Sequence, residues 1–304
     1  MRLAFNDDQQ MFNAALDQML GAEATGFRTV ADWGRWEYGA ALDATLSENG
    51  FFDAAREETL GPVAAAELVM RIAARPVVVE CAASALLVPL MGIDLPRPCA
   101  VIDGDADVVR FAPQARSVIW LGDRSRAALL PQSAVTPGET IFAFPVGAID
   151  TGALDWRDLA PAPAKVRARW QVALAAELVG ALTGGLDSVL THVRDRHQFG
   201  RPLGSFQAVQ HRLAADAVQL DSARWLVLRA AQTGGTGDAA LALGHGQNAA
   251  LRMIYDLHQF MGAMGLTLEH PLHRFTYRAK MLRAALGGPS VALRAFADDR
   301  WGVS

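Results

Sequence analysis

Residues 195–217 read "DRHQFGRPLGSFQAVQHRLAADA" and join two helical segments through a tight turn. The first part is a polar helix end, the middle contains the glycine and proline typical of a turn, and the last part begins a glutamine-rich amphipathic helix. The flanking segments consist mostly of Ala, Leu and Val, so a corner that carries Arg196, Gln198 and Phe199 differs from its surroundings. The composition singles out these three residues at the helix exit, but it does not by itself distinguish a binding site from a solvated helix end.

Helical periodicity continues on both sides of this corner. Long amphipathic stretches that share this pattern cover residues 164–199, 205–232, 238–265 and 289–301. Four helices with short connections predict a C-terminal four-helix bundle, which we assign to residues 163–304.

The first part of the chain is also helical, and the middle is not. Apolar residues recur at i, i+3, i+4, i+7 and i+8 in the first helical segment, at Phe12, Ala15, Leu16, Met19 and Leu20. Between residues 95 and 159 prolines and glycines become frequent, and runs such as "CAVI" and "SVIWLG" have the Val and Ile content of strands. We therefore predict a mainly α chain with an N-terminal helical domain at 1–94 and a reduced middle β domain at 95–162.

Composition excludes several classes of protein. The 304 residues are 51% apolar with a formal net charge of −4, which supports a packed core and gives no clustered basic surface for nucleic acid. The two cysteines form no C-x-x-C motif, and the N-terminus lacks the apolar region of a secretory signal, so we expect a cytoplasmic protein. The most membrane-like segment, residues 76–93, contains Glu80, Pro89 and Gly92 and is expected to be a buried helix, with no membrane partner.

Common catalytic signatures do not occur. The seven histidines include no set of three that converges with cysteine or carboxylate at metal-ligand spacing, so we expect no metal site. No G-x-S-x-G element occurs, which removes the usual serine-hydrolase interpretation.

Two patterns resemble the C-terminal helical domain of the acyl-CoA dehydrogenase family. The corner fits R-x-Q-F-G-x-P-L-x-x-F-Q-x-x-Q-x-x-L-A from Arg196 to Ala214, and residues 259–271 are similar to Q-x-x-G-G-x-G-x-T-x-E-x-P, with Ala263 in place of one glycine. The order of helices, strands and bundle fits the same family, and the resemblance is specific over residues 168–280. It implies an acyl-CoA dehydrogenase-like fold and a flavoenzyme that oxidises an acyl thioester to the α,β-enoyl form.

The resemblance also implies a shared FAD site. In that family, the arginine and the residues around Q-F-G reach across a dimer interface to FAD bound mainly by the neighbouring subunit. The implied cofactor-binding residues are Arg196, Gln198, Phe199, Gln259 and Gly262. A guanidinium can hold pyrophosphate oxygens in a two-pronged fork, and the turn offers N–H donors. Without the match to the family pattern, the simpler interpretation is that Arg196 is a solvated cation at a helix end and that Phe199 packs in the core.

The catalytic base of the family is not found at its usual positions. Removal of the α proton needs a carboxylate near the flavin. The family glutamate before Gly-Thr corresponds to Leu286, and the alternative position on an earlier helix corresponds to Trp170. Glu177 lies two turns beyond Trp170 and could be a displaced base, although a polar bundle residue is the simpler interpretation. In the family, a T-E-P-x-A-G-S-D stretch and a strand with a tryptophan wrap the flavin ring. Neither occurs in the middle domain of this chain, although Trp120 could imitate the tryptophan of that strand.

These features predict the subunit without a base in a heteromeric α2β2 acyl-CoA dehydrogenase. By resemblance, such short subunits occur in steroid degradation, where FAD lies at the unlike interface and the partner subunit carries the base and most acyl-CoA contacts. The family implies an electron-transferring flavoprotein as acceptor. The alternatives are a self-sufficient homodimeric dehydrogenase with a relocated base, and a flavin-free scaffold.

Overall fold

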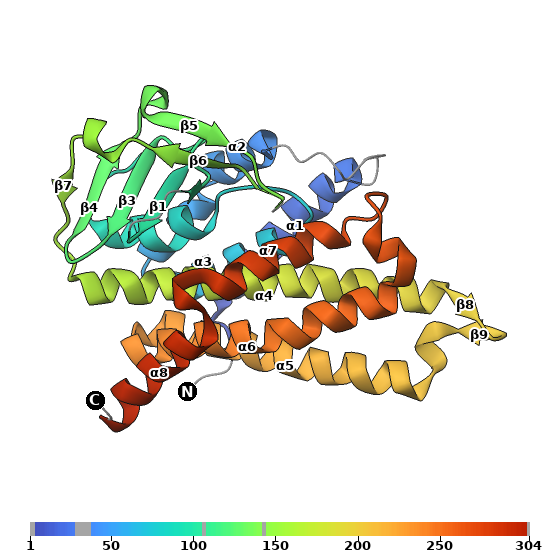
Figure 1. Cartoon of the computed structure of the whole chain (residues 1–304). Coiled ribbons are helices and arrows are strands. Elements are labelled where there is room, and N and C mark those ends of the chain that lie inside the picture. The colour runs from blue at the N-terminus through green and yellow to red at the C-terminus, as the bar shows by residue number, and fades with distance from the viewer. Residues whose placement is uncertain (1–3, 28–37, 105–107, 142–143, 303–304) are drawn as a thin grey trace.

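In a computed structural model, the chain is described over residues 4–27, 38–104, 108–141 and 144–302. Helices at the N-terminus, a small β module and a C-terminal helical bundle follow one another along the chain (Figure 1). The mainly α fold with this order of parts was predicted and is confirmed. The N-terminal elements are α1 (Asp7–Phe27), α2 (Ala40–Glu48), η1 (Phe51–Arg56) and α3 (Gly61–Ala73).

Most of residues 76–93 are buried, but they do not form the single helix that was predicted. Val78 pairs in a parallel bridge with Tyr38. The π-helical turn η2 (Ala83–Leu87) and the 3₁₀ turn η3 (Val88–Met91) follow. The segment thus starts extended and then changes from one helix type to another. Its apolar side chains fill the core between the N-terminal helices and the β module.

The β module contains two small sheets. Their strands are β1 (Cys99–Asp103), β2 (Val109–Arg110), β3 (Ser117–Leu121), β4 (Ser125–Leu129), β5 (Val135–Gly138), β6 (Val146–Ile149) and β7 (Arg157–Asp158). One sheet has the order β1-β3-β4-β7, with β1 parallel to β3, and the other has the order β2-β6-β5 and is antiparallel. Alternation along β3 turns Ile119 toward Val166 of the bundle and Val118 toward the second sheet. The first sheet is therefore apolar on both faces.

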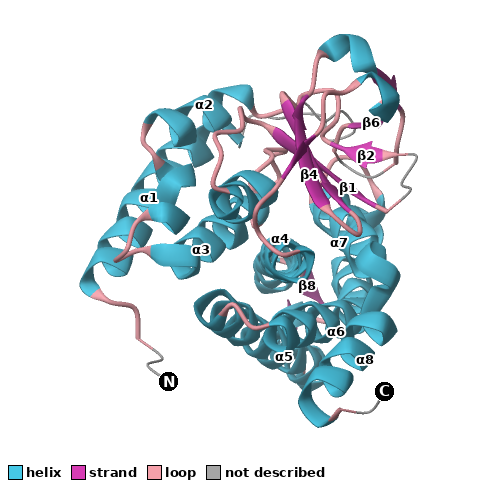
Figure 2. Cartoon of the chain, turned by 90° about the vertical axis from the view of Figure 1, so that its left-hand side faces the viewer, coloured by secondary structure: helices cyan, strands magenta, loops and turns pink. Residues whose placement is uncertain are grey.

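The C-terminal bundle contains one helix more than the four that were predicted. Its helices are α4 (Pro163–Asp195), α5 (Gln207–Thr233), α6 (Thr236–Met261), α7 (Leu272–Ala284) and α8 (Gly288–Trp301). Seen along its axis, α4 lies between α3, α5, α6 and α7, with the β module above it (Figure 2). By length and composition α4 could cross a membrane, but 83% of its most apolar window is buried inside the protein. Its apolar surface is the centre of the core.

Close approach of α3 to α4 depends on glycine. A Cβ atom placed at Gly180 would lie 2.2 Å from the carbonyl oxygen of Met70 and 2.7 Å from the Cβ of Ala73. Both contacts are far below van der Waals distance, and the first is with backbone that cannot rotate away. Gly180 therefore fixes the distance at which the N-terminal helices lie against the bundle.

We expect Gly180→Ala to lower the free energy of unfolding by about 3 kcal/mol, the upper part of the usual range for overpacking a core. Urea denaturation of the purified chain measures this change. The matched control is Gly21→Ala on α1, where an added Cβ meets nothing within 4 Å. That variant should be neutral or up to about 1 kcal/mol more stable, because alanine is the better helix former. Equal stability of the two variants would contradict the close-packing argument.

Candidate functional site: an exposed arginine corner and a small cavity

The corner at the end of α4 is a short β-hairpin that projects from the bundle (Figure 1). Its strands are β8 (His197–Gln198) and β9 (Arg201–Pro202), with Gln198 opposite Arg201. The two turn residues, Phe199 and Gly200, have φ values of 56° and 79°, as a type I′ turn requires. Phenylalanine is uncommon in this conformation, and the Phe199 side chain is 89% exposed. The hairpin thus holds an aromatic ring out into solvent, not in the core.

Arg196 lies beside an open hollow at the root of this hairpin. Its backbone carbonyl accepts a hydrogen bond from Leu203 N–H at 2.8 Å, which closes the hairpin and leaves the guanidinium exposed. The hollow has a volume of about 520 Å³ and is lined by Ser188, Thr191, His192, Asp195, Arg196, Met264 and His270. The connection between α6 and α7 therefore meets the end of α4 here.

Gln259 and Gly262 lie at the end of α6, close in sequence to the hollow but not among its lining residues. Gln259 follows Leu251 and Tyr255 at intervals of four on one exposed helix face, and the Tyr255 hydroxyl donates to Gln259 Oε1 at 3.4 Å. Gly262 ends the helix with φ 63° and ψ −146°, a conformation that suits glycine. The structure thus places all five predicted cofactor residues on exposed surface at one end of the bundle (Figure 1).

A second cavity lies where the β module meets the bundle. It has a volume of about 250 Å³, and Trp170 of α4 and Leu286 of the turn between α7 and α8 both line it. These are the two positions at which the family carries its catalytic base, and both therefore face one cavity. Leu286 adopts φ 54° and ψ 30° within η8 (Ala285–Gly287), an uncommon conformation for leucine. The volume is below the roughly 300–1,000 Å³ of typical ligand pockets.

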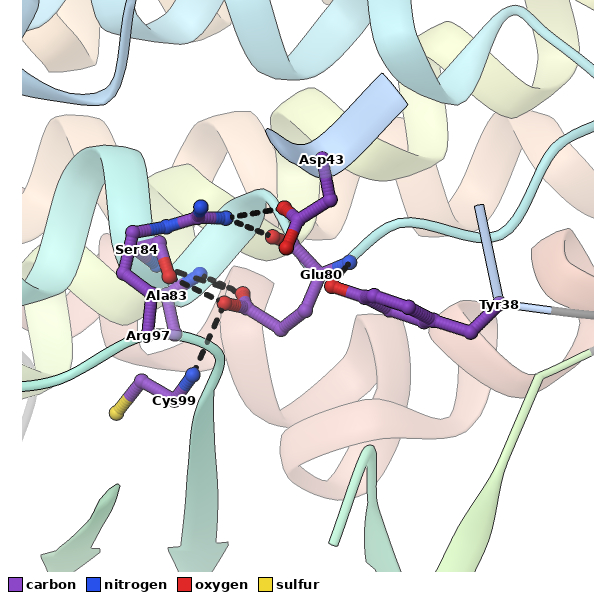
Figure 3. Close-up of polar contacts among 7 residues, drawn as sticks. All are labelled: Tyr38, Asp43, Glu80, Ala83, Ser84, Arg97 and Cys99. Carbon is purple, nitrogen blue, oxygen red and sulfur yellow. Dashed lines mark hydrogen bonds and ion pairs between the residues drawn. The ribbon is translucent and has the colours of Figure 1, made fainter. Parts of the chain in front are cut away.

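A buried carboxylate that the sequence interpretation missed also lines this cavity: Glu80 is 2% exposed. Figure 3 shows its oxygens accepting hydrogen bonds from Ala83 N–H at 2.8 Å, from Cys99 N–H at 3.2 Å and from the Ser84 hydroxyl. Burial raises the pKa of Glu80, which the Arg97 guanidinium partly opposes. Because both oxygens are occupied, Glu80 ties the start of η2 to β1. In the sequence, the only sign of this role is that Glu80 is a single charged residue within an apolar stretch.

The same cluster joins the N-terminal helices to the β module. Arg97 donates to Asp43 Oδ1 at 2.7 Å and to the carbonyl oxygen of Glu80 at 3.0 Å, and the Tyr38 hydroxyl accepts a hydrogen bond from Glu80 N–H (Figure 3). A second carboxylate of the cavity, Asp103, lies 3.1 Å from the Arg167 guanidinium of α4. The described carboxylates at this cavity are thus engaged in contacts that hold its walls together.

Glu177 is likewise engaged in a structural contact. The carboxylate is buried, and its Oε1 atom lies 2.5 Å from the Arg110 guanidinium of β2. The buried Arg278 of α7 lines the same small cavity as Glu177. Burial lowers the pKa of Arg278 to about 10, while Glu177 opposes this shift. Glu177 therefore places one negative charge near two arginines, between α4, α7 and the β module.

Trp120 does not imitate the flavin-facing tryptophan of the resemblance. Its ring lies 5.4 Å from that of Trp156, between centroids, and Arg126 stacks over it at 4.2 Å. These contacts lie on the face of β3 opposite to Ile119, whereas Val101 of the neighbouring strand lines the cavity from the other face. Because successive side chains of a strand point to opposite faces of the sheet, Trp120 points away from the face that carries Ile119.

The chain has an acyl-CoA dehydrogenase-like fold, in which N-terminal helices, a β module and a helical bundle follow one another. Residues 168–299 match the family model for the acyl-CoA dehydrogenase C-terminal domain. These residues form such a domain, and the chain has the fold of this family of flavin-dependent oxidoreductases.

Relatives and solved structures agree with this assignment. The acyl-CoA dehydrogenase IpdE2 of Mycolicibacterium smegmatis is 37% identical over 121 residues, which are 40% of this chain and 39% of IpdE2. IpdE2 of Mycobacterium tuberculosis is 28% identical over 205 residues, 67% of this chain and 61% of that protein. The matched region thus spans less than two thirds of each relative.

Three solved structures share the fold. The Tcur3481-Tcur3483 steroid ACAD variant has a TM-score of 0.77 at 22% identity, covering 96% of this chain and 97% of that chain. The ChsE4-ChsE5 complex of Mycobacterium tuberculosis has a TM-score of 0.75 at 17% identity, covering 98% of each chain. Butyryl-CoA dehydrogenase of Megasphaera elsdenii gives 0.71 at 19% identity, covering 98% of this chain and 99% of that chain.

We expect Glu177→Gln to lower the free energy of unfolding by about 3 kcal/mol, because removal of one partner leaves buried cations uncompensated. Urea denaturation measures this, with the exposed Glu48→Gln of α2 as a control that should change little. Turnover per folded molecule of the assembled enzyme should stay nearly constant. Unchanged stability together with a loss of turnover by orders of magnitude would instead identify Glu177 as a relocated base.

Proposed function

We propose that this chain is the subunit without a catalytic base in a heteromeric acyl-CoA dehydrogenase that oxidises an acyl-CoA thioester. The observation that carries the proposal is the cavity lined by Trp170 and Leu286. Neither side chain can accept a proton, and Glu80 and Asp103 beside them are engaged in structural contacts. The partner subunit would supply the carboxylate that removes the α proton.

The nucleotide end suits this chain better than the flavin ring does. The exposed Arg196 guanidinium can bind pyrophosphate oxygens, and the Phe199 ring offers an apolar face beside them. The small cavity, in contrast, leaves little volume for a flavin ring and an acyl chain together. Bound FAD would accept the β hydride, and the residues of this chain would hold and orient its nucleotide portion. The FAD would thus lie between two unlike subunits.

An exposed apolar surface next to the corner supports a partner subunit. Helix faces directed to water are usually polar. Along α6 and the turn that follows it, large apolar side chains are instead 44–79% exposed, at Leu251, Tyr255, Met264, Leu266 and Leu268. Met264 lines the hollow beside Arg196, so one partner surface could cover the apolar side chains and bring FAD to Arg196.

The heteromeric neighbours favour unlike subunits. The ChsE4-ChsE5 structure is a complex of two named chains, and the Tcur3481-Tcur3483 structure is described as a steroid ACAD. By analogy we propose an α2β2 assembly in the cytoplasm with a bulky, steroid-derived acyl group and an electron-transferring flavoprotein as acceptor.

Expression with and without a full-length acyl-CoA dehydrogenase partner tests this proposal. The chain purified alone should bind little flavin and should not reduce an electron acceptor with acyl-CoA. The co-purified pair should be yellow and active, because flavin retention needs both surfaces. A yellow, active chain without a partner would favour the self-sufficient alternative. A colourless pair would favour the flavin-free scaffold.

For the assembled pair, we expect Arg196→Ala to weaken FAD retention by about 1.5–3 kcal/mol, the range for a hydrogen bond to a charged group. Equilibrium dialysis of FAD against the complex measures this loss. Arg194→Ala is the matched control, because Arg194 is exposed in the last turn of α4 but does not line the hollow. Equal FAD affinity in the two variants would remove Arg196 from the nucleotide site.

A further inference from the structure

The hollow beside Arg196 contains two imidazoles whose positions are set by the fold. His192 projects from the last turn of α4, and His270 precedes α7. The His270 Nδ1 atom accepts a hydrogen bond from Leu272 N–H at 3.1 Å. The proton of the neutral ring therefore lies on Nε2, which remains a donor. The carbonyl oxygen of His270 contacts the ring of His273 at 3.0 Å, which further fixes this turn.

The two hydroxyl groups of the hollow already donate hydrogen bonds within their own helix. The Ser188 hydroxyl donates to the Gly184 carbonyl at 2.9 Å, and the Thr191 hydroxyl donates to the Asp187 carbonyl at 3.0 Å. Among the residues that the structure describes, no carboxylate forms an ion pair with His192, His270 or Arg196. These three cation-forming side chains are thus available to an added anion.

The net charge of the hollow depends on the two imidazoles. With both rings neutral, the Arg196 guanidinium is balanced by the Asp195 carboxylate, which lines the same hollow. With both rings protonated, two positive charges remain. The pyrophosphate of a dinucleotide carries two negative charges, so the protonated hollow matches it and the neutral hollow does not.

The empty hollow resists this protonation. Burial lowers the pKa of His192, the Arg196 guanidinium lowers it further, and Asp195 opposes the shift. Burial also lowers the pKa of His270, with His192 and His273 as further causes. Protonation of the His270 ring at Nδ1 would in addition break the hydrogen bond that Nδ1 accepts from Leu272 N–H. An anion placed between the rings would reverse the mutual repulsion and raise both pKa values, so anion binding would take up protons.

We propose that His192 and His270 join Arg196 in a pyrophosphate-binding site whose affinity increases as the pH falls. The inference rests on the proposed function, since the pyrophosphate would be that of the FAD shared with the partner. It adds two residues and a proton linkage that the family pattern in the sequence does not contain.

Titration of the purified chain with inorganic pyrophosphate tests the site without FAD or partner. Calorimetry at about pH 6 and about pH 8 spans the titration range of histidine. We expect at least about tenfold tighter binding at the lower pH, and the histidine NMR signals should report raised pKa values when pyrophosphate is bound. The double variant His192→Asn, His270→Asn should lose this pH dependence. His211→Asn, on the exposed surface of α5 outside the hollow, is the matched control and should keep it.

Pyrophosphate affinity that is equal at both pH values, or a pH dependence that survives in the double variant, would overturn the inference. The assembled complex separates this failure from that of the proposed function. A double-variant complex that keeps its FAD as tightly as the wild type at both pH values would also reject the histidine site, while leaving the shared flavin in place. A wild-type complex without FAD would reject the proposed function, and the pyrophosphate titration would still decide whether the hollow binds anions.

Discussion

Burial of Arg278 is the constraint on which the arrangement of the three parts depends. This side chain of α7 is 5% exposed and donates to the carbonyl oxygens of Ala73, the last residue of α3, and of Val77, which follows the helix, at 3.1 and 2.9 Å. Glu177 of α4 supplies a negative charge nearby and also pairs with Arg110 of the β module. A buried charge is tolerated only with such compensation. The N-terminal helices, β module and bundle are therefore fixed to one another by charges that none of them could bury alone.

This constraint bears directly on function, because it engages the carboxylate that could otherwise have served as a relocated base. The two ends of α4 then have different roles. Trp170 near its beginning helps to close the small cavity, whereas Arg196 directly after its end faces an open hollow. Under the proposed function, this chain would hold the nucleotide end of a shared cofactor, and a partner subunit would carry out the chemistry at the flavin ring. The exposed apolar side chains along α6 are consistent with such a division.

Patterns local in sequence predicted much of the fold. The helical periodicity identified α4, α5, α6 and α8, and Val and Ile runs located the strands. Helix α7 was missed as a separate element because its sequence, "LHRFTYRAKMLRA", carries buried arginines, whose partners lie at the end of α3 and in the segment that follows it. The roles of Glu80 and Glu177 were equally inaccessible, since Cys99 and Arg110 reach them only in the folded chain. The corner at Arg196 was predictable because its residues adjoin in sequence, whereas His270 reaches it through tertiary packing.

The central claim is that one FAD is shared between this chain and an unlike partner. Native mass spectrometry of the co-purified assembly counts chains and flavins in the same particle. The account predicts one FAD for each pair of unlike chains. Two FAD molecules per pair, or FAD retained by an assembly of this chain alone, would contradict it.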